Sequence, residues 1–180
     1  MRLAAALLLG LVLCSPLLAQ RKIGRDPLNA EEADKLRDTA QEPNERLKLY
    51  VGFARARLTS IQQVLADTKA KDRSKQLHDL LEDFATLCDE IGDNVETYHA
   101  DKWDIRKSLK IVIEGSSEFQ AELRAISEKT NGPEAPPDAE QYKFVLQDAT
   151  ESLNNYADDA RHILQEQNAL AKDKKLKKEE

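Results

Sequence analysis

Two pairs of side chains have a spacing that helical metal sites use. Glu96-x-x-His99 and Asp159-x-x-His162 each place a carboxylate and an imidazole about one helical turn apart. Carboxylate-bridged di-iron bundles carry a Glu-x-x-His pair on two helices and a single glutamate on each of the other two. In an antiparallel bundle, both pairs would lie toward the same end. The pattern therefore makes a carboxylate/histidine metal-binding bundle one alternative function.

The hydrophobic pattern around these residues argues against buried metal ligands. The neighbouring positions on the apolar stripe are Val95 and Tyr98 in one segment, and Ala160 and Ile163 in the other. The four candidates are one position off this stripe, so we expect their side chains to point sideways or outward. We therefore predict polar surface residues at these positions, with no metal and no cofactor.

The sequence carries none of the common motifs for covalent or phosphate chemistry. It has no phosphate-binding Gly-rich loop, no Gly-x-Ser-x-Gly nucleophile elbow and no Cys-x-x-Cys-His haem attachment site. Cys88 falls on an apolar stripe beside Leu87 and Phe84, which predicts a packed, unreactive thiol. We therefore predict a protein that is not an enzyme.

The net charge argues against nucleic acid as a partner. The 180 residues include 27 basic and 33 acidic side chains, for a formal charge of -6. A surface that binds nucleic acid needs a basic excess to displace counterions. The one dense basic run, residues 172–178, is interrupted by Asp173 and closed by two glutamates, so we interpret it as a solvated tail. A membrane-surface or lipid-binding protein that uses this run is a second alternative function.

The first 20 residues have the order of a cleaved secretory signal peptide. A positive start at Met1-Arg2 precedes an apolar run, Leu3–Leu13, which is too short to span a bilayer, and Ala19 supplies a small residue for cleavage. Cys14 raises lipid attachment as a rival, although Leu13 is larger than the residue that normally precedes a lipidated cysteine. We expect a secreted or periplasmic protein of the bacterial cell envelope, with no membrane contact after cleavage. The mature chain would keep one cysteine and no Asn-x-Ser/Thr acceptor, which favours a bacterial periplasm.

Apolar residues recur at alternating steps of three and four along four successive segments. This spacing places one apolar stripe on one face of each predicted helix. Gly115 lies next to such a stripe, where we expect it to permit close approach of another helix. The stripe positions are Leu47, Val51, Ala54, Leu58, Ile61 and Leu65; Leu77, Leu81, Phe84, Cys88, Ile91, Val95 and Tyr98; Ile105, Leu109, Val112, Ser116, Phe119, Leu123 and Ile126; and Tyr142, Leu146, Ala149, Leu153, Tyr156, Ala160, Ile163, Gln167 and Leu170.

Several residues indicate where these helices begin and end. Pro43 suits a first helical turn, and the polar stretch 68–72 predicts a turn because the apolar phase slips across it. Asn131-Gly132-Pro133 predicts a stop, with Gly132 in the left-handed conformation, and Asp138 is expected to cap the next helix. At residues 99–102 the phase runs through unbroken without Gly or Pro. We favour a turn there, because one continuous helix would leave a long apolar stripe without a partner.

These observations predict an all-α protein: an up-down-up-down antiparallel four-helix bundle preceded by a short N-terminal helix. The expected organisation is a signal peptide at 1–20, a segment with a short helix at 21–42, the bundle at 43–171 and a charged tail at 172–180. Trp103 is expected to anchor the start of the third long helix, or else to be exposed for contact with a partner. The function that fits best is a non-enzymatic protein-interaction or structural role, with an unidentified protein partner or self-association.

Overall fold

The computed structural model describes residues 25–179, and these residues form helices and turns without a strand. The predicted all-α class is confirmed. The signal peptide and Cys14 lie outside the described residues. The elements are α1 (Ala30–Asp38), α2 (Pro43–Ala66), α3 (Arg73–Ala100), α4 (Arg106–Asn131), the short 3-10 helix η1 (Ala139–Gln141) and α5 (Lys143–Glu179).

The helix boundaries follow local chemistry. Asn29 and Glu32 form a reciprocal capping box at the start of α1, and Pro43 occupies the first turn of α2 as predicted. The predicted break at 68–72 is confirmed, because α2 ends at Ala66 and α3 begins at Arg73. The spacing of apolar residues is interrupted between α2 and α3 because the turn separates two independent helices.

The predicted turn at 99–102 is also confirmed, and its hydrogen bonds were not predictable from the sequence pattern. The backbone N–H of Trp103 donates to the carbonyl of Tyr98 at 2.9 Å, and that of Lys102 donates to His99 at 3.0 Å. This pair of bonds is the Schellman motif. Lys102 has a φ of 63°, in the left-handed region where glycine is usual. A lysine there costs roughly 1–2 kcal/mol, so the turn lacks its usual glycine signal.

Two predicted details at the α4–α5 connection are wrong. Gly132 has a φ of −78° and a ψ of 173°, which is extended backbone rather than the left-handed conformation. Asp138 makes no side-chain cap, because its carboxylate instead accepts two hydrogen bonds of 2.6 Å from Arg73 at the start of α3. The connection is thus held by a long-range ion pair, and η1 intervenes before α5 begins.

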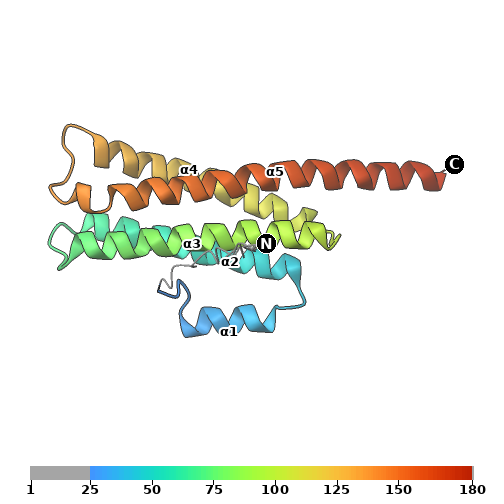
Figure 1. The fold of residues 1–180 in the computed structure, drawn as a ribbon, viewed down its shortest axis with the longest axis horizontal. Helices are drawn as coiled ribbons and strands as arrows, with labels where there is room; N and C mark the ends of the chain where they lie inside the picture. Colours follow the sequence, from blue (N-terminus) through green and yellow to red (C-terminus); the bar gives the residue numbers. More distant parts are fainter. Residues whose placement is uncertain (1–24, 180) are drawn as a thin grey trace, which may run out of the picture.

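The four long helices lie side by side around one core, and α1 packs outside them (Figure 1). Of these four, α2 contacts α3 and α4, and α5 contacts the same two helices from the other side. All predicted stripe positions are buried except four near helix ends: Leu65, Tyr98 and Gln167 are partly buried, and Leu170 is exposed. Each buried leucine contributes roughly 1.5–3 kcal/mol to folding before entropy is counted, so this core stabilises the arrangement of helices.

A close approach of α2 and α4 explains one glycine. A Cβ placed on Gly115 would lie 2.9 Å from Cγ1 of Val51, closer than real carbon atoms pack. Gly115 therefore allows the two helices to meet, as the sequence predicts. Cys88 is fully buried on α3, also as predicted.

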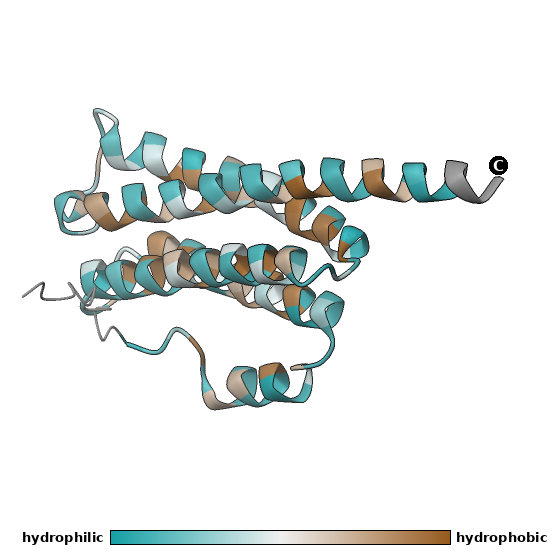
Figure 2. Cartoon of the chain, turned by 45° about the vertical axis from the view of Figure 1, so that its right-hand side comes forward, coloured by the Kyte–Doolittle hydropathy of each residue, from teal (hydrophilic) through white to brown (hydrophobic). Residues whose placement is uncertain are grey.

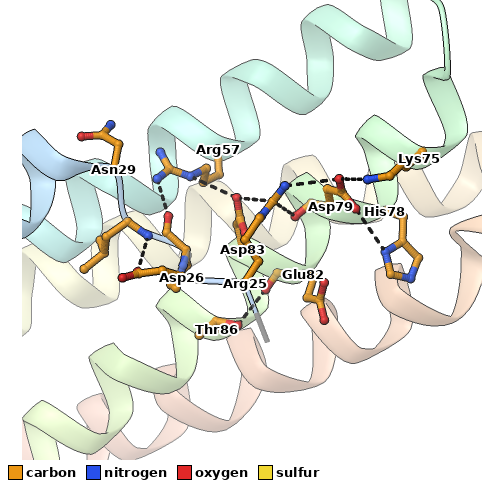
Figure 3. Close-up of polar contacts among 12 residues, drawn as sticks. Arg25, Asp26, Asn29, Arg57, Lys75, His78, Asp79, Glu82, Asp83 and Thr86 are labelled. Atoms are coloured by element: carbon orange, nitrogen blue, oxygen red, sulfur yellow. Dashed lines mark hydrogen bonds and ion pairs between the residues drawn. The ribbon is translucent and has the colours of Figure 1, made fainter. Parts of the chain in front are cut away.

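A salt-bridge network attaches the N-terminal segment to α2 and α3 (Figure 3). Arg57 of α2 donates hydrogen bonds of 2.9 and 2.5 Å to Glu32 of α1, and a further bond to the carbonyl of Pro27. Arg25 lies 2.7 Å from Asp83 of α3. The Arg57 and Glu32 side chains are only 13% and 9% exposed, so this contact is largely shielded from water.

The last turns of α5 extend past the ends of the other helices (Figure 1). With 37 residues, α5 is about 55 Å long. It continues through the predicted tail at 172–180 as helix to Glu179. Its projecting end is mostly hydrophilic, with isolated hydrophobic bands (Figure 2). Among the described residues, no helix is long and apolar enough to cross a bilayer.

Candidate binding notch

The α3–α4 turn is fastened to α5 at the point where α5 leaves the other helices. The side-chain amide of Gln167 accepts a hydrogen bond of 3.2 Å from the N–H of Ile105 and donates one of 2.9 Å to the carbonyl of Trp103. These two backbone groups of the turn have no hydrogen-bond partner within a helix, and the amide of Gln167 supplies one. This explains why a glutamine occupies a position on the apolar stripe of α5.

A cavity of about 610 Å³ lies between this turn and α5. We call it the notch. Its apolar lining comes from Ala100 and Trp103 on one side and from Leu170 and Ala171 on the other. The volume falls within the range of roughly 300–1,000 Å³ that is typical of small-molecule sites.

Two large apolar side chains are exposed at the notch. Trp103 is 47% exposed and Leu170 is 57% exposed. Trp103 follows the Schellman turn and precedes α4 by three residues, so its anchoring of that helix stays a prediction. Its exposure agrees with the alternative reading of this residue. Leu170 is exposed because the apolar stripe of α5 runs beyond the end of α3.

The rim of the notch is cationic. Lys102 and Lys174 line it and form no salt bridge within the described chain. Arg106 is neutralised by Asp104, which accepts hydrogen bonds of 2.8 and 2.6 Å from its guanidinium. The hydrogen bond from Arg106 lowers the pKa of Asp104, and the nearby charge of Lys174 lowers it further. Among the residues that line the notch, Lys102, Arg106 and Lys174 outnumber Asp104, so the rim has a net charge of +2.

A second, shallower cavity continues the positive surface. It has a volume of about 390 Å³, and Lys107, Lys110 and Asn168 line it together with the Asp104–Arg106 pair. Asn168 begins the last part of α5, residues 168–179, which we call the arm. The side chains that line the two cavities carry a net positive charge, and the apolar side chains of the notch lie beside them.

The structure brings two of the predicted metal-ligand candidates together through a residue that the sequence analysis missed. Nε2 of His99 lies 3.0 Å from one carboxylate oxygen of Glu166, and Nε2 of His162 lies 3.7 Å from the other. Glu166 stands one turn after His162 on α5, so a search for i, i+4 partners of the histidines would have found it. It tethers the end of α3 to α5 beside the notch.

The remaining candidates, Glu96 and Asp159, are exposed and take no part in that contact. Within residues 25–179, no three His, Cys, Asp or Glu side chains converge closely enough to hold a metal ion. His99, Glu166 and His162 therefore form a polar contact between α3 and α5.

A further cavity, of about 520 Å³, lies between α2 and α4 near Leu65 and Ile126. It contains neither of the exposed apolar side chains of the notch. The third exposed large apolar residue, Phe144, lies at the opposite end of α5 and lines none of these cavities. Of the three cavities described above, only the notch combines exposed large apolar side chains with a cationic rim.

Comparison with protein-family models, curated proteins and solved structures finds no match to this chain. Its function must therefore be argued from the geometry of the notch. An apolar floor with a cationic rim can bind a ligand that presents an apolar face flanked by negative charges.

Proposed function

We propose that this chain is an exported, non-enzymatic protein that binds another protein at the notch. The observation that carries this proposal is the pair of exposed apolar side chains, Trp103 and Leu170, in one recess. Tryptophan is enriched among the residues that dominate binding energy at protein interfaces. Residues 1–20, with the pattern of a signal peptide, support export to the secreted or periplasmic space.

The chemistry of the described residues supports binding rather than catalysis. Burial raises the pKa of the Cys88 thiol well above its ordinary value, and the charge of Asp89 raises it further. A thiol that stays protonated inside a core is a poor nucleophile. His99 and His162 face a shared carboxylate at the surface rather than a hydroxyl or thiol.

The scaffold in this proposal is the predicted up-down-up-down antiparallel four-helix bundle. Its support is the cyclic set of helix contacts, together with hydrogen bonds that join the beginnings of alternate helices. Asn44 of α2 bonds the backbone of Asp104 and Ser108 near the start of α4, and Ser74 of α3 bonds Gln141 just before α5. In this scaffold, the notch lies at the end where α5 extends past the other helices.

Recovery of a partner with matched variants tests the proposal. The mature protein, purified under mild conditions from the cells that make it, is expected to retain a bound protein. Trp103→Ala/Leu170→Ala should reduce the amount recovered at least about tenfold, a loss of about 1.4 kcal/mol or more. Phe144→Ala removes a ring that is 71% exposed at the far end of α5, and it should change nothing. Equal recovery with all three proteins would contradict the proposal, provided that circular dichroism shows unchanged helicity.

A further inference from the structure

The shape of the notch suits an elongated helical ligand. One wall is the α3–α4 turn, and the other is the first part of the α5 arm. Beyond Gln167, residues 168–179 continue this wall as helix for about 18 Å. A helix is about 10–12 Å wide with its side chains, so a partner helix of about three turns can lie along the arm with its end in the notch.

The charges around the notch define what this helix must carry. Lys102 and Lys174 stand at its rim, and Lys107 and Lys110 line the adjoining cavity. A ligand with Leu-like side chains toward Trp103 would place its flanking residues against these lysines. We propose that the partner contributes an acidic amphipathic helix, with carboxylates on both sides of an apolar stripe. This inference rests on the proposed function and specifies the chemistry of its partner.

A second copy of this chain fits the same surface poorly. A two-fold dimer through this end would bring identical patches together. The two α5 arms, each with lysines at 172, 174 and 175, would then face one another. Like charges at such distances destabilise the contact. Self-association is therefore a weaker explanation of the notch than an acidic partner.

An anionic membrane is also a weaker explanation. Trp103 and Leu170 line opposite walls of a recess, whereas a bilayer surface is broad and contacts side chains on a convex or flat face. The recess therefore favours a partner helix that inserts a row of its side chains.

Trp103 provides a direct readout, because it is the only tryptophan of the chain. The probe is a synthetic helical peptide of about five turns (roughly 18 residues), with leucine along one face and glutamate on both flanks. A sister peptide carries lysine in place of every glutamate. The glutamate peptide should shift the emission of Trp103 to shorter wavelength and saturate, because the ring becomes buried. The lysine peptide should not shift it.

Charge removal on the rim tests the electrostatic part. Lys102→Gly/Lys174→Gln removes both charges, and glycine at 102 suits the left-handed turn, so the fold is preserved. This variant should bind the glutamate peptide at least about tenfold more weakly. The matched control, Lys69→Gln/Lys71→Gln, removes two exposed lysines from the turn between α2 and α3 and should bind normally.

Three results with the peptides would each overturn the inference: no emission shift with the glutamate peptide, equal binding by the rim variant, or equal binding of both peptides. A shift caused by phosphatidylglycerol vesicles without one from the peptide would overturn it in favour of a membrane. A concentration-dependent shift of the protein alone, with matching dimerisation in analytical ultracentrifugation, would overturn it in favour of a second copy. If any of these occurs while Trp103→Ala/Leu170→Ala still loses its partner, the proposed function stands and only the partner chemistry is wrong.

Discussion

The side chain of Gln167 donates a hydrogen bond of 2.9 Å to the backbone carbonyl of Trp103, and so fixes the position of the exposed indole relative to α5. The same amide accepts from Ile105. One residue therefore couples the two walls of the notch. If the notch is a binding surface, this coupling sets its shape before any partner arrives, which reduces the entropy lost on binding.

Gln167→Ala should loosen the α3–α4 turn without unfolding the protein. It leaves two backbone groups of the turn without their partner, so the free energy of unfolding should fall by about 1–3 kcal/mol. The fluorescence anisotropy of Trp103 should fall as well, because the ring gains freedom. Asn168→Ala, at the next and exposed position, is the control. An unchanged anisotropy in Gln167→Ala would show that the amide does not hold the turn.

Alanine should have opposite effects at two glycines. Gly115→Ala places a methyl group 2.9 Å from Val51, so it should destabilise the protein by roughly 1–3 kcal/mol. Gly52 has open space around the added carbon and lies on an exposed helix face, so Gly52→Ala should stabilise the protein by about 1 kcal/mol. Urea unfolding measures both. Two changes of the same sign would contradict the close approach of α2 and α4.

Glu32→Gln should release the N-terminal segment. It removes the charge that Arg57 binds through two hydrogen bonds, and should lower the free energy of unfolding by about 1–3 kcal/mol. Limited proteolysis should then cut within residues 25–42 faster than in the unmodified protein. The control is Glu118→Gln, which breaks the exposed pair with Arg55 and should have an effect of at most about 1 kcal/mol. Equal proteolysis of both variants would contradict a structural role for the shielded pair.

The effect of Glu32 should depend on pH in one direction. Burial raises the pKa of Glu32, but hydrogen bonds from Arg57 and from the backbone of Asn29 outweigh it and lower the pKa below its ordinary value. The folded state thus binds this proton less readily than the unfolded state, so the stabilisation is complete at neutral pH and is lost as the pH falls. The difference in unfolding free energy between the unmodified protein and Glu32→Gln should shrink below about pH 4.3. A constant difference would show that the carboxylate charge plays no part.

Metal analysis separates the binding hypothesis from the carboxylate/histidine alternative. Protein purified without chelator should contain no metal in stoichiometric amount, and His99→Ala/His162→Ala should leave its metal content unchanged. The physical reason is that these histidines share Glu166 as an ion-pairing partner and converge with no further ligand among the described residues. Stoichiometric metal that disappears in the double variant would contradict the proposed function.

The core was predictable because each of its helices repeats one periodic pattern. Leu81, Leu109 and Leu153 are all buried, as the steps of three and four require. One failure occurs where a distant residue replaces a local signal: Asp138 binds Arg73 instead of capping its own helix. This ion pair leaves no periodic trace in the sequence. The extended conformation of Gly132 is a second departure from the local pattern.

The notch was not predictable from the same patterns. The apolar stripe predicts a core position for Gln167. Its side chain instead binds the backbone of a turn 62 residues earlier in the chain. The exposure of Leu170 depends on where α3 ends. The sequence gives no clear signal for that end, because Lys102 occupies the left-handed position where glycine is usual. The sequence did identify Trp103 and His99 as residues of interest, but only the fold shows that they border one recess.

Site-specific photo-crosslinking shows directly whether the notch contacts another protein. A photoreactive phenylalanine analogue is placed at position 103, 170 or 144 in the full chain, and the cells that make the protein are irradiated. Positions 103 and 170 are expected to crosslink to the same protein, and position 144, at the far end of α5, is expected not to. Crosslinking at 144 alone, or at none of the three positions, would contradict the proposed function.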